Sequence, residues 1–162
     1  MKKLIVSFAL MVITLASYAQ VYKMYSTRNY HNQLRLNTMT GEVQQIQDDG
    51  QSWIICSARE ISGDKESRFC LYETQNMWTF ILLDSYNGRL WQVQYSTQDL
   101  DNLFCIPINK DELGSDNEKC IFSIQPLTSM YQYYLINDRT GDIWKFQWST
   151  KGDDYRWIEK FK

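Results

Sequence analysis

The sequence is poor in the residues and motifs on which catalysis, metal binding and nucleic-acid binding depend. His31 is the only histidine, and the chain has no Gly-x-Ser-x-Gly elbow, no glycine-rich phosphate loop and no His-Glu-x-x-His helix. A net charge of −2 argues against a nucleic-acid partner, which selects a basic surface. The two prolines do not define a linker, and no stretch after the N-terminal segment keeps a helical period for three turns. These absences favour one sheet-rich domain without a recognisable catalytic motif.

The N-terminal segment has the pattern of a secretion signal. Two lysines start the chain, a short apolar run occupies residues 4–15, and Ser17-Tyr18-Ala19 supplies small residues at the positions that a signal peptidase reads. The apolar run is shorter than the roughly 20 residues that a transmembrane helix needs. We expect a signal peptide over 1–19, cleavage after Ala19, and no membrane span in the mature chain. The protein is then periplasmic, displayed on the cell surface or extracellular.

One turn pattern occurs three times along the chain. A short polar residue is followed four positions later by a glycine, and apolar, partly aromatic segments flank both. The polar residues are Asn37, Asp84 and Asn137, and the glycines are Gly41, Gly88 and Gly141. The polar side chain is expected to accept a hydrogen bond from the backbone two residues on, and the glycine to adopt a positive φ. The pattern predicts three β-hairpins of one type.

Strict alternation of apolar and polar residues around these turns extends each hairpin into four strands. The fold class is therefore all-β, a pseudo-threefold repeat of four-stranded antiparallel units within a single domain over 20–162. The repeats cover about 20–58, 66–109 and 117–162. The predicted strands are 21–27, 32–36, 42–47 and 52–57; 68–74, 77–83, 89–96 and 103–108; and 119–125, 130–136, 142–149 and 155–161.

The third hairpin, Asn137-Asp138-Arg139-Thr140-Gly141-Asp142-Ile143-Trp144, resembles the hairpin of pyrroloquinoline-quinone-type β-propeller repeats, which carry Asp-x-x-Thr-Gly-x-x-x-Trp. The second copy keeps Asp84, Gly88 and Trp91, whereas the first has Gln44 in place of the tryptophan. The resemblance implies blade-like units. Three repeats are too few to enclose a quinone, so no cofactor is expected.

Two ways of arranging the three units stay open. In a small propeller-like ring, the last strand near Ile158 lies beside the first strand near Met24. In a β-trefoil, the three repeats share one barrel. Both arrangements accommodate three four-stranded repeats in a chain of this length.

The four cysteines lie at the two junctions between repeats, at Cys56, Cys70, Cys105 and Cys120. Each junction has one cysteine on either side of a polar loop, which predicts the disulfides Cys56–Cys70 and Cys105–Cys120 across two hairpins. An exported chain permits this chemistry. The alternative, a zinc site, lacks a Cys-x-x-Cys pair and a second histidine, and no metal is expected.

Several side chains are candidates for a binding surface. Trp53 and Trp157 lie at strand ends near polar loops, where an indole ring can serve as a platform for a sugar or a peptide. Glutamines predict either a polar groove or a solvated sheet face; they are Gln45, Gln47, Gln92, Gln94 and Gln147. His31 aligns with Trp78 and Tyr131, so we expect its ring to pack or pair where they place aromatic rings, instead of serving as a general base. The acidic pairs Asp48-Asp49 and Asp153-Asp154 are expected to shape turns.

These observations favour an exported, non-catalytic binding module that recognises a glycan or a protein through its loops or through an aromatic and amide-rich surface. Two alternatives remain. One is a hydrolase that acts on glycans through a carboxylate pair drawn from separate repeats. The other is a structural subunit of a cell-envelope assembly, joined through its sheet edges.

Overall fold

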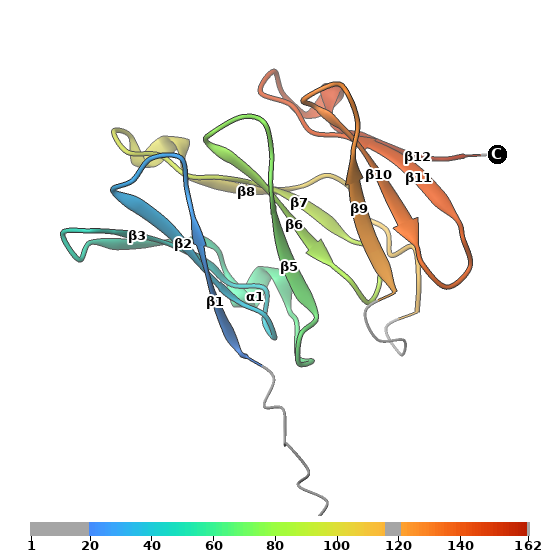
Figure 1. Ribbon diagram of the computed structural model, residues 1–162, viewed down its shortest axis with the longest axis horizontal. Helices are drawn as coiled ribbons and strands as arrows, with labels where there is room; N and C mark the ends of the chain where they lie inside the picture. The colour runs from blue at the N-terminus through green and yellow to red at the C-terminus, as the bar shows by residue number, and fades with distance from the viewer. Residues whose placement is uncertain (1–19, 116–120, 162) are drawn as a thin grey trace, which may run out of the picture.

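The computed structural model describes residues 20–115 and 121–161, which form three four-stranded antiparallel sheets (Figure 1). Sheet 1 contains β1 (Tyr22–Ser26), β2 (Asn32–Asn37), β3 (Val43–Gln47) and β4 (Ser52–Cys56). Sheet 2 contains β5 (Phe69–Glu73), β6 (Thr79–Asp84), β7 (Leu90–Gln94) and β8 (Phe104–Pro107). Sheet 3 contains β9 (Phe122–Pro126), β10 (Gln132–Asn137), β11 (Ile143–Gln147) and β12 (Trp157–Lys160).

The all-β class and the repeat of four-stranded units are confirmed, and each observed strand overlaps the predicted one. The connections add three short helices, α1 (Ala58–Ile61), η1 (Leu100–Asn102) and η2 (Asp153–Tyr155). Across the described residues, no helix has the length and apolar character needed to cross a membrane. The predicted signal peptide, 1–19, lies outside the described residues.

Each repeat keeps its strands in its own sheet, in chain order from one edge to the other. A β-trefoil would instead draw strands of all three repeats into one barrel, and the described strands form none. β1 and β12 are edge strands of different sheets, so the first and last strands do not pair within one sheet.

The three sheets follow one another in a row, with sheet 2 in the middle (Figure 1). We call the face that a sheet turns toward the next sheet in the chain its leading face, and the opposite one its trailing face. The leading face of sheet 1 carries Leu34, Leu36, Val43 and Gln45. It packs on the trailing face of sheet 2, which carries Phe80, Leu82, Trp91 and Val93. The same arrangement joins sheets 2 and 3, so β6 is buried along its whole length.

The trailing face of sheet 1 has no sheet packed on it, and its residues differ accordingly. Gln33, Arg35 and Gln44 occupy the positions of Phe80, Leu82 and Trp91. The guanidinium of Arg35 donates a hydrogen bond to the Gln44 amide oxygen. Polar residues on the outer face of a terminal unit are typical of stacked repeats. The glutamine that replaces the hairpin tryptophan therefore marks the solvated end of the stack.

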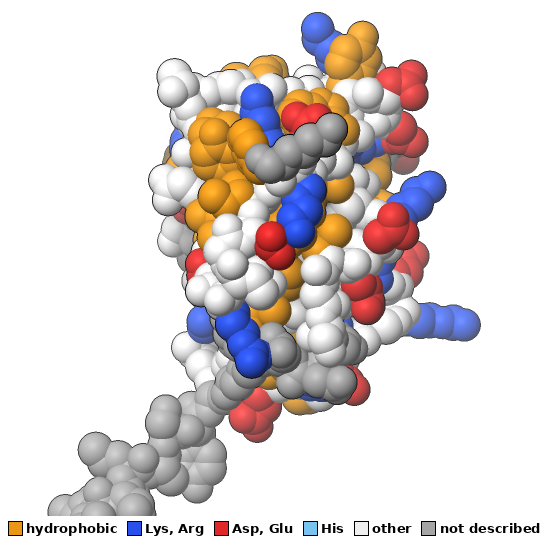
Figure 2. Space-filling view, turned by 90° about the vertical axis from the view of Figure 1, so that its right-hand side faces the viewer, with side chains coloured by type: hydrophobic (Ala, Val, Ile, Leu, Met, Phe, Trp, Pro, Cys, Tyr) orange, Lys and Arg blue, Asp and Glu red, His pale blue; other side chains and the backbone are white. Residues whose placement is uncertain are grey.

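The leading face of sheet 3 forms the opposite end of the stack. Figure 2 shows this side of the molecule, where hydrophobic side chains alternate with basic and acidic ones. Ile143 and Phe161 are exposed there, and Lys145 lies opposite Glu159 in the β11–β12 pair on the same face. Charged residues on an unpaired sheet face oppose further stacking.

The hairpin turns follow the predicted geometry. Gly41, Gly88 and Gly141 have φ values of 78°, 76° and 76°, and the preceding Asn or Asp side chains accept the expected backbone hydrogen bonds. The hairpin turns of sheets 1 and 2 also form hydrogen bonds with the sheet that follows. In the first turn, the carbonyl of Thr38 accepts the N–H of Phe69 at 2.9 Å. In the second turn, the carbonyl of Ser85 accepts the N–H of Phe122 at 3.0 Å.

The disulfide pairing differs from both predicted pairs. Cys56 of β4 is bonded to Cys105 of β8, with their Cα atoms 5.2 Å apart, so the disulfide joins sheet 1 to sheet 2. The prediction was wrong because it treated each junction as a hairpin, whereas the chain crosses from one sheet to the next there. The last strands of successive sheets become neighbours instead. Cys70 lies in β5, and Cys120 lies outside the described residues.

Alkaline titration offers a test of the packing between sheets 2 and 3. Burial raises the pKa of Tyr72 to about 12, from an ordinary value of 10.0. The unfolded chain therefore loses this proton at a lower pH than the folded chain does, so the contribution of Tyr72 to stability is complete below pH 10 and lost as pH rises through 12. We expect the urea midpoint to fall over this range, and to fall less in a Tyr72→Phe variant. An identical pH dependence in the two proteins would contradict this packing.

Candidate functional site

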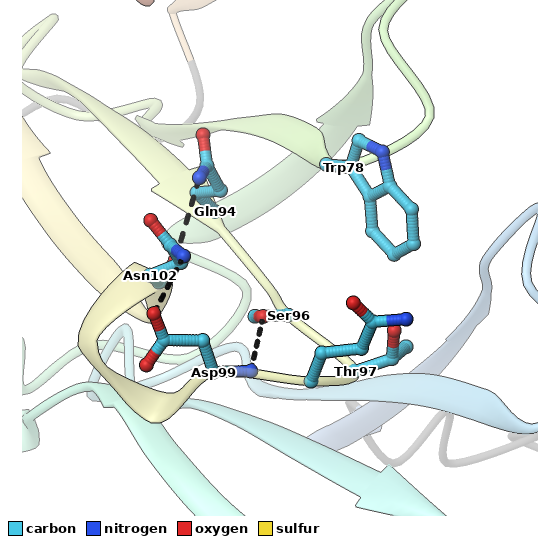
Figure 3. Close-up of a pocket in the computed structure, with 7 residues that line it drawn as sticks. Trp78, Gln94, Ser96, Thr97, Asp99 and Asn102 are labelled. Carbon is cyan, nitrogen blue, oxygen red and sulfur yellow. Dashed lines mark hydrogen bonds between the residues drawn. The ribbon is translucent and has the colours of Figure 1, made fainter.

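A cleft of about 460 Å³ lies at one end of sheet 2 (Figure 3). It lies between the turn that joins β5 to β6 and the loop that joins β7 to β8. Its lining is one indole surrounded by amides, hydroxyls and one carboxylate. The lining residues are Trp78, Gln94, Ser96, Thr97, Gln98, Asp99 and Asn102.

The loop after β7 is held open by η1, which Asp99 caps. One carboxylate oxygen of Asp99 accepts the N–H of Asp101 at 2.9 Å, and the other accepts the side-chain amide of Asn102 at 3.1 Å. The N–H of Asp99 itself donates to the Ser96 hydroxyl at 3.3 Å. Both oxygens of the one carboxylate in the cleft are therefore engaged in shaping its wall.

Trp78 forms the opposite wall. The backbone N–H of Trp78 donates to the side-chain oxygen of Asn76 at 2.8 Å, and its backbone carbonyl accepts the N–H of Tyr95 at 3.1 Å. The Trp78 and Tyr95 rings pack with centroids 5.2 Å apart. Tyr95 is fully buried, whereas Trp78 is only partly buried. The buried Tyr95 ring therefore supports the Trp78 ring, which lines the cleft.

The glutamines divide into two groups that the sequence does not distinguish. Gln45 and Gln92 are fully buried and connect sheets. The Gln45 amide donates to the Ser96 carbonyl at 2.7 Å, and Gln92 accepts the N–H of Ser149 at 3.2 Å. Gln94 instead lines the cleft, where its amide reaches the Asn102 carbonyl at 3.4 Å. Gln45 and Gln92 therefore hold the loops that contain Ser96 and Ser149, and the loop with Ser96 lines the cleft.

The two tryptophans predicted as platforms lie in different settings. Trp53, in β4, lines a separate concavity of about 210 Å³, which shares the Ser96–Asp99 loop with the cleft of sheet 2. Trp157, in β12, lines none of the clefts described here, and the ammonium of Lys145 lies 5.8 Å from its ring centroid. The structure thus brings Trp53, but not Trp157, close to the cleft of sheet 2.

His31 is paired with a carboxylate at the position where the other repeats place an aromatic ring. Its Nδ1 lies 2.5 Å from a carboxylate oxygen of Asp48, and both side chains are exposed. His31 and Asp48 occupy the positions of Trp78 and Tyr95, so a solvent-exposed contact between an imidazole and a carboxylate replaces a ring pair on the outer face of sheet 1.

The remaining acidic residues of the two predicted turn pairs shape turns. Asp49 accepts the N–H of Gln51 at 2.9 Å, and Asp153 pairs with the guanidinium of Arg156.

A four-residue motif marks the cleft, and sequence reasoning missed it. The motif begins at the last residue of the strand, as Gln94-Tyr95-Ser96-Thr97 at the end of β7 and as Gln147-Trp148-Ser149-Thr150 at the end of β11. The first repeat instead has Gln47-Asp48-Asp49-Gly50 and a tight turn. The shared glutamine, aromatic ring, serine and threonine were the signal that could have located the site. No protein-family model, curated protein or solved structure matches this chain.

Proposed function

We propose that the protein is an exported, non-catalytic binding module that takes a neutral saccharide unit in the cleft of sheet 2. The observation that carries this proposal is the exposed face of Trp78 opposite a wall of amides and hydroxyls. A pyranose ring presents an apolar C–H face and a polar rim, so it can stack on an indole while its hydroxyls bond to the amides. The cleft volume, about 460 Å³, lies within the range of roughly 300–1,000 Å³ typical of small-ligand sites.

Two features of the described structure favour binding over hydrolysis. Asp99 is the single carboxylate among the residues lining the cleft, and both of its oxygens accept hydrogen bonds from η1. A glycosidase of the usual type needs two carboxyl groups about 5–10 Å apart, one of them able to exchange a proton. The Cys56–Cys105 disulfide is compatible with export.

We also propose that the three sheets are blades of propeller type. The leading-to-trailing packing of successive sheets supports this relation, as does the hairpin resemblance. It makes the loops that follow β7 and β11 repeated features of one scaffold.

A glycan array probed with residues 20–162, purified from an oxidising compartment, tests the proposal. We expect binding to neutral glycans that a Trp78→Ala variant weakens at least thirtyfold, because buried aromatic contacts of this kind contribute about 2 kcal/mol. A Trp157→Ala variant is the matched control, since this indole lines none of the clefts described here.

Because Trp78 also packs against the core, a second variant separates binding from folding. Gln98 is an exposed residue of the cleft, and Gln98→Ala is expected to weaken binding without changing the melting temperature. Gln125→Ala alters an exposed glutamine of β9 and is expected to change neither. The proposal is contradicted if the array shows no glycan binding, or if Gln98→Ala binds as wild type.

A further inference from the structure

The cleft of sheet 2 has a counterpart at the corresponding end of sheet 3. This second cleft, of about 190 Å³, is lined from the same structural positions. Its lining residues are Tyr131, Gln147, Trp148, Ser149, Thr150, Lys151 and Tyr155. The Tyr131 and Trp148 rings lie 4.9 Å apart, as the Trp78 and Tyr95 rings do at 5.2 Å. The two clefts are therefore repeated versions of one arrangement.

The polar framework is repeated as well. The Gln147 amide donates to the Tyr155 carbonyl at 3.0 Å, which matches the contact of Gln94 with Asn102 in sheet 2. Trp148 is fully buried and donates its indole N–H to the Met130 carbonyl at 3.0 Å, whereas Tyr131 is exposed. As in sheet 2, a buried ring supports a more exposed ring at the mouth of the cleft.

The charge of the second cleft is opposite to that of the first. Lys151 stands where sheet 2 has Gln98, and Gly152 stands where it has Asp99. Lys151 is the one charged residue among those lining the second cleft. The backbone N–H of Lys151 donates to the Ser149 hydroxyl at 2.9 Å, and its ammonium lies 5.8 Å from the Tyr155 ring centroid. The contacts place a cation at the rim beside Tyr155, and both tyrosines of this cleft are exposed to solvent.

We propose that the cleft of sheet 3 is a second saccharide site, selective for a unit that carries a negative charge. The exposed Tyr131 and Tyr155 rings provide stacking surfaces, and Lys151 provides an ion pair to a carboxylate or a sulfate. This inference rests on the proposed function, because it assigns the same kind of ligand to the repeated cleft. The protein then binds a mixed polysaccharide through two sites of different charge preference.

Affinity electrophoresis in gels containing polygalacturonate, dextran sulfate or uncharged dextran tests the second site. We expect the mature protein to be retarded by at least one of the two polyanions, despite its own negative charge. The carboxylated and sulfated gels distinguish the two anionic groups. A Lys151→Gln variant is expected to bind that polyanion about tenfold more weakly, because a charged hydrogen bond is lost. Tyr131→Ala is expected to weaken it similarly.

Lys145→Gln is the matched control. Its ammonium also lies 5.8 Å from an aromatic ring centroid, that of Trp157, on the same sheet but outside the cleft. Equal losses in the Lys145 and Lys151 variants would show non-specific charge attraction and overturn the second site. Absence of retardation by both polyanions would overturn it too. Trp78→Ala is expected to leave polyanion retardation unchanged. If polyanion retardation is absent while binding to neutral glycans is retained, only the second site is contradicted.

Discussion

The Gly41→Ala variant will unfold at a markedly lower urea concentration than the wild-type protein, with a loss of about 3 kcal/mol in the free energy of unfolding. Gly41 has a φ of 78°, where a Cβ atom costs about 1–2 kcal/mol. The added Cβ would also overlap Cγ2 of Ile61 and lie 3.0 Å from Cε1 of Phe69. Both neighbours are buried between sheets 1 and 2, so relief requires repacking of that boundary.

Gly141→Ala separates the backbone contribution from the packing contribution. Gly141 has nearly the same φ, 76°, but no atom lies within 4 Å of the position that its Cβ would take. We therefore expect a loss of about 1 kcal/mol for this variant. Urea unfolding followed by tryptophan fluorescence gives both values, provided that the slope m is unchanged. Equal losses at the two glycines would contradict the packing of the first turn against α1 and β5.

The strands and turns were predictable because their signals are local. Alternation sets the two faces of a strand, and a glycine with a polar residue four positions earlier defines the turn. All twelve strands follow from these rules. The buried ion pair of Arg68 with Asp84, at 2.7 Å, has no such signal. Its partners are 16 residues apart in the chain and are brought together by the pairing of β5 with β6.

The stacking of the sheets was encoded in the sequence but could not be interpreted before the structure was known. Gln33, Arg35 and Gln44 make the first repeat look like a degraded copy of the others. In the structure these residues form the solvated trailing face of sheet 1, and His31 with Asp48 continues it. The departures from the repeat are therefore information about which face is exposed.

The candidate site was only partly predictable. Of the two tryptophans expected to be platforms, Trp53 lines a concavity and Trp157 lines none of those described above, whereas Trp78 was expected to be a packing residue. The cleft is formed by irregular loops around η1 and η2, whose course depends on caps such as Asp99 and not on periodicity. Strand alternation cannot show that Gln92 is buried against Ser149 while Gln94 faces solvent near a loop.

The Cys56–Cys105 disulfide is expected to make the largest single contribution to stability. It closes a segment of 49 residues, and the chain-entropy relation gives about 4 kcal/mol for a loop of that length. Replacing both cysteines with alanine should lower the free energy of unfolding by at least this amount. Peptide mapping of the non-reduced protein should yield a linked pair containing Cys56 and Cys105. A linked pair containing Cys56 and Cys70 would instead restore the junction hairpins that the sequence suggested.

The double variant measures lost side-chain packing together with the lost cross-link, because Cys56 is fully buried. Measuring the stability of the wild-type protein and of the double variant, each with and without reductant, separates the two contributions. If the assignment is right, reductant destabilises the wild-type protein by about 4 kcal/mol more than it destabilises the Cys56→Ala/Cys105→Ala variant. Any other reducible bond contributes equally to both proteins and cancels from this difference. A difference near zero would mean that the cross-link does not connect sheets 1 and 2 in solution, and that their packing alone holds the two sheets together.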